Sequence, residues 1–431
     1  MRRYIFADTA IAERNNDPVF SLSDMDFYKF PMGQYAFYFL RGIIVTFELI
    51  IRDKTMPTAD IIPERTLRRA LDRLRARSFE QRLIQRLRAT GYFTEEYLSF
   101  LSTAKLPPYH LERRGSQYVL TFTGPYELVK YWETIGMATF SELLYREVMK
   151  DLTRDELEDI YQAADKRLVG TLNALREYPD IKFSEFGHRR RHARWWQSHV
   201  IESAKILMPK QLLGTSNVWM AGEHGIKPGG TNAHSQQMVE IALAETDDEM
   251  RAAQYEVYRK WYELYKDHPE LLVLLTDTEG SAQWYANAPS WLAHEYKGDR
   301  QVSGEPIAQG ELTMAWLESH GVDPMSWNTM FSDGLSAKSA ITIHTHFAGI
   351  HQHNFGIGTN MTNDFVGIAP ELPYLRQFSM ACKVVRVIDR QGRTKSAVKL
   401  SNNEGKGTGL DLEHHRRVFG SGGRISEKPL V

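Results

Sequence analysis

The stretch "HTHFAGIHQHNFGIGTN", residues 344–360, shows the pattern that decides the fold of most of this chain. A helix-like segment ends here, a short strand-like run follows, and the run closes with "FGIGTN". Glycine and hydroxyl residues at the carboxyl end of a strand are typical of βα units, where they lie at the ligand-binding edge. The stretch leaves two kinds of site open, because its glycines suit a phosphate and its histidines suit a transition metal.

The same alternation of helix and strand runs through residues 139–370. Amphipathic helices are expected at 141–177, 193–206, 234–267 and 305–320. Strand-like runs that end in glycine or polar residues lie at 181–187, 211–217, 271–278, 328–334 and 351–360. Because helices and short strands alternate, we expect an α/β domain with parallel strands whose carboxyl ends carry the site.

The two ends of the chain have a different pattern. Residues 35–52 alternate like a strand, and residues 62–100 have the apolar spacing of two or three helices. A hairpin that leads into a helix is expected at 109–134, and further strands with a turn at "DRQG" are expected at 374–401. These features predict a second, β-rich α+β domain from residues 1–138 and 371–431.

Bulk properties exclude several classes of function. The 431 residues contain 53 lysines and arginines against 54 aspartates and glutamates, so no overall charge favours nucleic acid or an anionic membrane. The single cysteine, Cys382, excludes an internal disulfide framework and a cysteine-rich zinc site. No apolar run approaches the roughly 18 residues of a membrane helix, and we read no signal peptide. A cytoplasmic protein is therefore expected.

The strand ends carry residues that suit an anionic ligand. Arg189 and Arg190 follow one strand, and arginine matches the geometry of phosphate or carboxylate, although a solvated helix start is the simpler interpretation. His234 opens a predicted helix, where the helix dipole disfavours the charged imidazole; an incidental histidine in a capping loop is equally compatible. Asp333 ends a further strand and can accept hydrogen bonds from sugar hydroxyls. Together these strand ends suggest a phosphorylated sugar across a barrel mouth.

Seven segments in order make the chain similar to the nicotinate phosphoribosyltransferases, which are type II phosphoribosyltransferases. They are "SLSDMDFYKFPMGQ" (21–34), "FSEFGHRRR" (183–191), "LLGTSN" (212–217), "PGGTNAH" (228–234), "FSDG" (331–334), "FGIGTN" (355–360) and "KLSNNEGK" (399–406). The resemblance implies an irregular (β/α) barrel with a second domain built from both chain termini. It implies transfer of phosphoribosyl from phosphoribosyl pyrophosphate to nicotinate in NAD salvage, with Mg²⁺ on the pyrophosphate. It also implies ATP as a co-substrate through a phosphohistidine.

The resemblance assigns roles residue by residue. His234 matches the phosphorylated histidine, and Tyr28 matches a base-stacking tyrosine that reaches into a neighbouring subunit, which implies a homodimer. The base-binding residues would be Tyr28, Ser216, Thr231 and Arg300. The phosphoribosyl- and phosphate-binding residues would be Arg189, Arg190, Asp333, Gly334, Gly356, Gly358 and Thr359. Ser216 stands where amide-specific relatives carry an aspartate, so nicotinate is the expected base.

Departures from the family pattern keep alternatives open. Residues 300–306 read "RQVSGEP", with Val302 in place of an aspartate that contacts the ribose, and valine cannot accept a hydrogen bond. Glu305 is a conservative change that could compensate in part. Val302 motivates two alternatives: a divergent paralogue that acts on another pyridine or azole acid or another sugar-phosphate donor, and a catalytically silent family member.

A third alternative is a metal-binding protein that uses His344, His346, His351 and His353. Residues two apart do not share a face of a helix, so His344 and His346 cannot chelate one ion if their segment is helical. His351 and His353 share a face of the expected strand. We expect buried, hydrogen-bonded histidines there, no protein-held metal, and a phosphate cradle at the following glycines.

Overall fold

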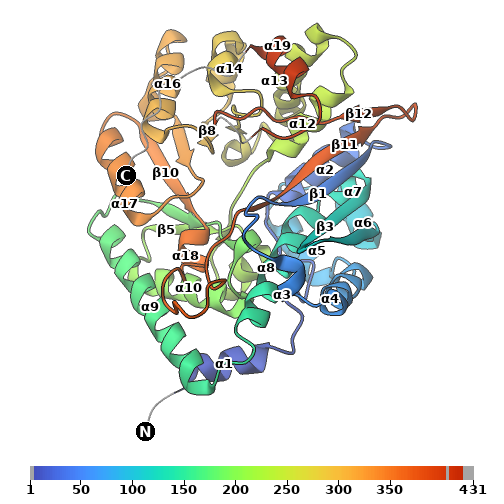
Figure 1. Cartoon of the computed structure of the whole chain (residues 1–431). Coiled ribbons are helices and arrows are strands. Elements are labelled where there is room, and N and C mark those ends of the chain that lie inside the picture. The colour runs from blue at the N-terminus through green and yellow to red at the C-terminus, as the bar shows by residue number, and fades with distance from the viewer. Residues whose placement is uncertain (1–3, 404–406, 421–431) are drawn as a thin grey trace.

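The computed structural model describes residues 4–403 and 407–420 and contains two β-sheets (Figure 1). One sheet is antiparallel and has five strands, and the other is parallel and has seven. The mixed α/β architecture agrees with the expectation from the sequence, and each sheet belongs to one of the two predicted regions.

The antiparallel sheet joins the two ends of the chain. Its strands, in spatial order, are β12 (Thr394–Ser396), β11 (Met380–Ile388), β1 (Ile44–Ile51), β3 (Gln117–Pro125) and β2 (Tyr109–Arg114). In Figure 1 the orange-red β11 runs beside the blue β1, and their register pairs Ile44 with Ile388 and Ile51 with Met380. The prediction of a β-rich domain from both termini is therefore confirmed for the described residues.

Eight helices of the described residues belong to this part of the chain; the first contacts the later helix Arg154–Arg176, and the others gather around the sheet. They are α1 (Ile5–Glu13), α2 (Lys29–Phe39), α3 (Thr58–Ile61), α4 (Glu64–Ala76), α5 (Gln81–Ala89), α6 (Glu95–Thr103), α7 (Tyr126–Val129) and α8 (Trp132–Val148). Residues 35–39 belong to α2, so the prediction of a strand from residue 35 was wrong. Nine residues of α2, 29–37, are buried, and this all-round burial removes the polar face by which a surface helix is recognised.

The parallel sheet is a curled, open half-barrel. Its strands, in spatial order, are β6 (Lys227–Pro228), β5 (Leu212–Thr215), β4 (Phe183–Glu185), β10 (Gln352–Ile357), β9 (Asn328–Phe331), β8 (Gly298–Gln301) and β7 (Val273–Leu274). The first strand of this sheet along the chain, β4, pairs with the last one, β10. The two edges of the sheet are β6 and β7, which follow one another along the chain, so the barrel wall is broken between them.

Helices alternate with these strands much as the sequence predicted. They are α9 (Arg154–Arg176), α10 (Arg194–Leu207), α11 (Val218–His224), α12 (His234–Leu243), α13 (Asp247–Tyr265), α14 (Ser281–Asn287), α15 (Trp291–Glu295), α16 (Pro306–Ser319), α17 (Ala337–Phe347), α18 (Thr359–Thr362) and α19 (Leu412–Phe419), with short 3₁₀ turns at His188–Arg190, Pro269–Leu271 and Pro324–Ser326. The single helix expected at 234–267 is two helices, because Thr246 caps α13 with a capping box to Glu249. The helix expected at 141–177 likewise divides into α8 and α9, where Thr153 and Glu156 form a capping box.

Helix α8 crosses the predicted boundary between residues 138 and 139. It packs against β1 and β11 and also contacts the turn at His188–Arg190, so it belongs to both domains. The boundaries 1–138, 139–370 and 371–431 stay predictions. Among the helices of the described residues, none is long and apolar enough to cross a membrane.

Candidate active site

The loop of residues 21–28 lies across the carboxyl ends of β4 and β5. Its backbone makes an isolated bridge between Asp26 and Asn217, and Phe27 N donates to Ser216 O at 2.6 Å. The Ser216 hydroxyl donates to Asp26 Oδ1 at 2.5 Å. The predicted base-binding residue Ser216 is therefore brought beside a carboxylate from the N-terminal loop, which the sequence alone did not indicate.

Tyr28 ends this loop and is 7% exposed. Its hydroxyl donates to Glu133 Oε1 at 3.2 Å, and Glu133 also forms a buried ion pair with Lys29. A Cβ atom on Gly230 would lie 3.2 Å from the Cβ of Tyr28, so the glycine allows the loop before α12 to approach Tyr28 closely. Tyr28 thus lies within the site of its own chain in this structure.

Two predicted arginines face Tyr28. Arg189 lies 3.7 Å from both Asp26 Oδ2 and Glu133 Oε1, and its side chain is 42% exposed. Arg300 extends from β8; burial lowers its pKa, and the charge of Arg189 lowers it further, while Tyr28 and Asp277 act in the opposite direction. No ion pair to Arg300 occurs within residues 4–403 and 407–420, and its buried Nε has no hydrogen-bond partner there. The guanidinium is available for an anionic ligand.

His234 begins α12, as predicted, and is part of a buried cluster. Its Nε2 lies 2.7 Å from Asp277 Oδ1 and 2.8 Å from Lys399 Nζ. Lys399 also donates to Asp277 Oδ2 at 2.7 Å, and the Ser303 hydroxyl donates to the same oxygen at 2.6 Å. These contacts join the ends of β7 and β8 to a segment near the C-terminus, and they fix the plane of the imidazole.

The imidazole of His234 is held neutral. Burial lowers its pKa, the carboxylate of Asp277 raises it and the charge of Lys399 lowers it, with a result of about 3. The pKa of Asp277 is well below its usual range: burial raises it, but His234 and Lys399 lower it more. Because Lys399 supplies the charge that balances Asp277, the ring does not need to be protonated. A neutral imidazole with one nitrogen fixed by a carboxylate is suited to nucleophilic attack.

The glycines of "FGIGTN" pack closely around Phe186. A Cβ on Gly356 would lie 2.6 Å from the ring of Phe186, and a Cβ on Gly358 would lie 2.9 Å from its carbonyl oxygen. Phe186 follows β4, and its ring also approaches Gly229, where a Cβ would lie 3.7 Å away. Phe186 is half-buried among glycines at the ends of β10 and β6. The sequence analysis missed this residue, although it lies within "FSEFGHRRR".

The remaining predicted residues lie at the rim. Asp333 is exposed, has a φ of 79°, and interacts electrostatically with Arg189 and Arg190. Gly334 accepts a hydrogen bond from Asn360 Nδ2 at 2.9 Å, which ties the turn after β9 to the start of α18. Positive φ is rare for aspartate, so the tight turn here holds a strained backbone at the mouth of the barrel.

The structure brings most predicted residues together. One group lies around Tyr28 and comprises Ser216, Arg189 and Arg300, with the buried Thr231 in the loop beside it and His234 at one side. The other group lies toward the rim and comprises Gly356, Gly358, Thr359, Asp333, Gly334 and Arg190. The sequence analysis missed Asp26, Glu133, Phe186, Asp277 and Lys399. Asp277 lies three residues after β7, within the strand-like run expected at 271–278, and was detectable by the strand-end rule. Lys399 begins the segment "KLSNNEGK", but its pattern gave no role to the lysine. Residues 404–406 of "KLSNNEGK" lie outside the described residues.

The four histidines of residues 344–360 do not converge. His344 and His353 contact each other at 2.9 Å, His351 bonds to Thr329 and to the carbonyl of Pro324, and His346 bonds to Glu311. Within residues 4–403 and 407–420 no group of three metal-ligating side chains could hold an ion. The buried His351 is a hydrogen-bonded histidine of the sheet.

The residues at the rim are compatible with Mg²⁺ that arrives on a substrate. Mg²⁺ is commonly held by one or two carboxylates plus substrate phosphates rather than by a protein cage. Asp333 is an exposed carboxylate beside two arginines, and it is the described rim residue that could meet such an ion. Mg²⁺ bound there would supply positive charge to the phosphates of a substrate.

Comparisons with known proteins agree with this geometry. The sequence model of the nicotinate phosphoribosyltransferase (NAPRTase) family matches residues 181–422, and that of the NAPRTase N-terminal domain matches residues 24–141. The chain is similar to the crystal structure of nicotinate phosphoribosyltransferase from Porphyromonas gingivalis, with 26% identity and a TM-score of 0.81 over 93% of this chain and 99% of that one.

Two further solved structures have the same fold. The nicotinate phosphoribosyltransferase from Vibrio cholerae is 26% identical, with a TM-score of 0.81 over 93% of each chain. A structure from Saccharomyces cerevisiae is 23% identical, with a TM-score of 0.78 over 93% of this chain and 98% of that one, and supports the fold alone. Because the family model covers more than half of the 431 residues, the chain belongs to the nicotinate phosphoribosyltransferase family.

Proposed function

We propose that this protein is an enzyme that transfers phosphoribosyl from phosphoribosyl pyrophosphate to nicotinate, and that it releases nicotinate mononucleotide and pyrophosphate for NAD salvage. The observation that carries this proposal is Arg300, a guanidinium that faces Tyr28 and has no ion pair within the described residues. A planar aromatic acid presents a ring to Tyr28 and a carboxylate to Arg300, and arginine binds carboxylates through paired hydrogen bonds.

We propose that Phe186 forms a second wall of the site that binds the base. The ring of Phe186 approaches Gly229, and Tyr28 approaches Gly230, so two aromatic side chains flank adjacent glycines. We propose that the pyridine ring lies between them, next to Thr231 and Ser216. Offset stacking on two aromatic faces orients the ring nitrogen toward the anomeric carbon.

The reaction itself needs little acid–base chemistry. Displacement at an anomeric carbon passes through a cationic, oxocarbenium-like state, so a site that anchors the phosphates and orients the base is sufficient. Arg189 and Arg190 are placed to hold phosphate groups, and Gly334, Gly356, Gly358 and Thr359 let backbone approach the sugar phosphate. We propose that Asp333 contacts a ribose hydroxyl or the Mg²⁺ ion on the pyrophosphate.

ATP coupling through His234 is a further part of the proposal. Nε2 lies between the Asp277 carboxylate and the Lys399 ammonium, and we propose the tautomer in which Nε2–H donates to Asp277 while Lys399 donates to Asp277 Oδ2. The free lone pair is then on Nδ1, and we propose that this nitrogen attacks the γ-phosphorus of ATP. The new bond is Nδ1–P, the broken bond is the β–γ bridge, and ADP leaves. Lys399 supports this step because its charge keeps Asp277 ionised and the ring neutral.

We also propose a cytoplasmic homodimer, as the resemblance to the family implies. Tyr28 contacts Glu133 of its own chain here, so mixing two variants that each lack ATP-stimulated activity is informative. If Tyr28 serves the partner's site, a mixture of Tyr28→Ala and His234→Ala chains regains ATP-stimulated activity in the hybrid site. If Tyr28 serves its own chain, the mixture stays as inactive as its components.

The test of the main reaction uses purified protein, Mg²⁺, phosphoribosyl pyrophosphate and a panel of pyridine acids and amides, with and without ATP. We expect nicotinate mononucleotide from nicotinate. Arg300→Met should raise the KM for nicotinate roughly 10- to 100-fold, because a charge-assisted hydrogen bond is lost. Arg82→Met, at an exposed arginine, is the control. Absence of product with every base would overturn the proposal.

One observation favours a second candidate, a divergent paralogue with another base or donor. Both carboxylate oxygens of Glu305 are engaged at the start of α16, where they accept from Ile307 N at 3.2 Å and Ala308 N at 2.7 Å. Glu305 therefore serves as the cap of α16, which favours a site without the aspartate that the family has at position 302; compensation by Glu305 stays a prediction. Turnover of a different pyridine or azole acid in the same panel, without turnover of nicotinate, would establish this candidate.

A further inference from the structure

The break in the barrel wall lies beside the start of α12. Strands β6 and β7 are the two edges of the parallel sheet, and the loop of residues 229–233 spans the space between them. No strand ladder joins this loop to β7 within the described residues; instead, Asn232 Nδ2 donates to Val273 O on β7 at 2.9 Å. A side chain thus supplies a hydrogen bond that backbone pairing supplies elsewhere in the sheet.

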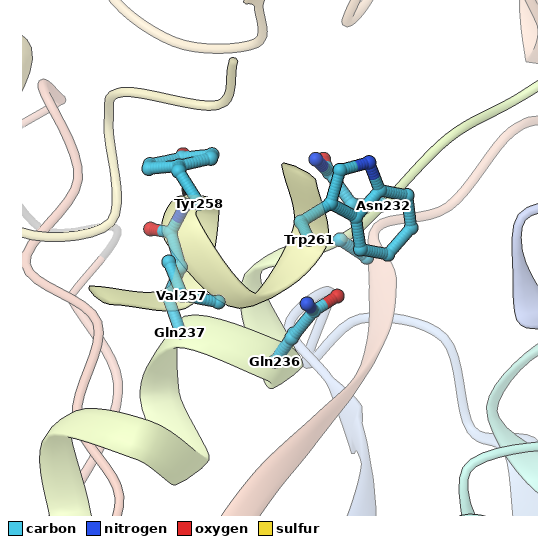
Figure 2. Close-up of a pocket in the computed structure, with 7 residues that line it drawn as sticks. Asn232, Gln236, Gln237, Val257, Tyr258 and Trp261 are labelled. Carbon is cyan, nitrogen blue, oxygen red and sulfur yellow. Dashed lines mark hydrogen bonds between the residues drawn. The ribbon is translucent and has the colours of Figure 1, made fainter. Parts of the chain in front are cut away.

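A small cavity lies next to this bond. Figure 2 shows its lining side chains, which come from the loop before α12, from α12 itself and from α13: Asn232, Gln236, Gln237, Val257, Tyr258 and Trp261. The centre of a water-sized sphere can move through about 10 Å³ inside it. A single water molecule needs roughly 10–15 Å³ by this measure, so the cavity holds one molecule of that size.

Two amide oxygens at this cavity have no hydrogen-bond partner in the described part of the chain. They are Asn232 Oδ1 and Gln236 Oε1, from side chains that are 6% and 2% exposed. The Asn232 amide is fixed in orientation because its Nδ2 donates to Val273 O at 2.9 Å, and the Gln236 amide interacts with the hydroxyl of Tyr35. The oxygens are therefore the groups that remain to be satisfied.

The other polar groups of the lining are already paired. The Tyr258 hydroxyl donates to Leu275 O at 2.7 Å, and Trp261 Nε1 donates to Leu271 O at 2.9 Å. Gln237 donates to Leu275 O at 2.8 Å and accepts from the Thr278 hydroxyl. The occupant must consequently offer two donors to the two free oxygens, finds no unpaired donor in the described residues of the wall, and has the size of water.

We propose that a single buried water molecule binds here and bridges Asn232 Oδ1 to Gln236 Oε1. Its two O–H groups match the two orphan oxygens, and the bridge ties the loop of residues 229–233 to the first turn of α12. The water thereby completes the hydrogen bonding at the place where the barrel wall is open.

An ammonium ion shares the two-donor chemistry, but it suits the cavity less well. Two of its four N–H groups would find no acceptor, and its charge would lie against the apolar wall of Val257. The faces of Trp261 and Tyr258 offset only part of this cost. Water satisfies both oxygens without a buried charge.

The decisive experiment is a crystal structure of the whole chain at a resolution better than about 1.8 Å. We expect one spherical density peak within roughly 2.7–3.2 Å of both oxygens. A cavity without density, or amides that have rotated to bond with protein groups, would overturn the proposal. This readout does not depend on catalysis, so it stands apart from the proposed reaction.

Variants provide a matched comparison. In Gln236→Met one acceptor is lost and the peak should disappear, whereas in Gln254→Met, at a buried glutamine of α13 that pairs with Gln283, the peak should persist. Persistence of the peak in Gln236→Met would contradict the bridge. If Gln236→Met does not fold, the presence or absence of the density peak in the wild-type structure still tests the proposal.

Melting temperatures distinguish the two occupants. With water bound, the wild-type protein should melt at the same temperature in ammonium chloride and in sodium chloride at equal ionic strength. A rise that grows with ammonium concentration would assign the site to ammonium, since a ligand that binds only the folded state stabilises it by mass action.

Discussion

The guanidinium of Arg191 and the carboxylate of Asp24 form a two-point ion pair, with Nη1–Oδ1 at 2.8 Å and Nη2–Oδ2 at 2.9 Å. Both side chains are fully buried. Asp24 belongs to the loop that ends at Tyr28, and Arg191 follows Arg189 and Arg190, the two arginines that we propose bind phosphate. The third arginine of "HRRR" therefore does not bind substrate; it holds the N-terminal loop on the strand ends.

Arg191→Met should destabilise the protein strongly. The substitution leaves Asp24 buried without its partner, and removal of one member of a buried pair typically costs about 3–5 kcal/mol. The free energy of unfolding from denaturant titration measures this loss. Arg190→Met, a half-buried arginine of the same turn, serves as the control. A loss below about 1 kcal/mol for Arg191→Met would show that solvent replaces the pair.

The same pair should make the protein sensitive to acid. Burial raises the pKa of Asp24, but the charge and hydrogen bonds of Arg191 bring it down to about 2, below its ordinary value of 3.8. A lowered pKa gives stability that is present above pH 3.8 and lost as the pH falls toward 2. The contribution is about 2 kcal/mol. Asp24→Asn should therefore lose less stability than the wild type between pH 5 and pH 3, measured by unfolding at each pH.

The strand-end rule could predict much of the site from the sequence. Arg189 and Ser216 each follow a short strand that could be recognised, and parallel strands bring their carboxyl ends to one edge. His234 was predicted from its place at the start of a helix, whereas the two-residue strand β6 before it was not. Tyr28 was predicted through the family resemblance. The docking of its loop depends on Asp24 and Arg191, which are 167 residues apart, and no local pattern shows such a pairing.

Strand β8 shows why part of the fold could not be predicted. Its sequence "GDRQ" has no apolar residue, yet Asp299 is fully buried and accepts hydrogen bonds from several groups, including Trp327 Nε1 at 2.9 Å and Thr329 Oγ1 at 2.5 Å. Hydrophobic periodicity cannot detect a strand whose burial is stabilised by polar partners elsewhere in the sequence. Lys399 escaped notice for the same reason, because its partners His234 and Asp277 come from other elements.

Removal of the imidazole should uncouple ATP from transfer. In His234→Ala the acceptor of the phosphoryl group is absent, so we expect basal transfer without ATP stimulation. The comparison of initial rates with and without ATP measures the effect. Asp277→Asn should retain less than a tenth of the stimulation, because an amide does not hold the ring in the tautomer with a free Nδ1. Full ATP stimulation in His234→Ala would exclude the phosphohistidine.

The pH profile tests the role of Lys399. Burial and the charge of Lys399 lower the pKa of His234 to about 3, so the ring is neutral at pH 5 and ATP stimulation should persist there. In Lys399→Met this pKa should rise, and the stimulation should fall as the pH is lowered from 8 to 5. Lys395→Met, at a lysine that binds Glu245 outside the site, is the control. If the pH profile of ATP stimulation is unchanged in Lys399→Met, Lys399 does not keep the imidazole of His234 neutral.

Substitution by methionine should have opposite effects on the free energy of unfolding at two neighbouring buried lysines. Lys130 is fully buried with one acceptor, Glu127 O at 3.0 Å, and burial holds its pKa well below the usual range. Because burial disfavours the charged form of Lys130 in the folded protein relative to the unfolded chain, Lys130→Met should stabilise by about 1–2 kcal/mol. Lys29→Met leaves Glu133 unpaired and should cost about 3–5 kcal/mol. Denaturant unfolding of both variants checks this, and destabilisation by Lys130→Met would refute it.

Gly356→Ala tests whether Phe186 forms a wall of the base site. The new Cβ would lie 2.6 Å from Cδ2 and 2.9 Å from Cε2 of Phe186, closer than carbon atoms approach, so the ring must move. Because the ring stacks on the base in our proposal, the KM for nicotinate should rise roughly 10-fold, the effect of about 1.4 kcal/mol of lost stacking. Gly170→Ala, in the middle of α9 with no neighbour within 4 Å, is the matched control and should leave KM unchanged. Steady-state kinetics with nicotinate as the varied substrate measure both variants, and an unchanged KM in Gly356→Ala would place the base away from Phe186.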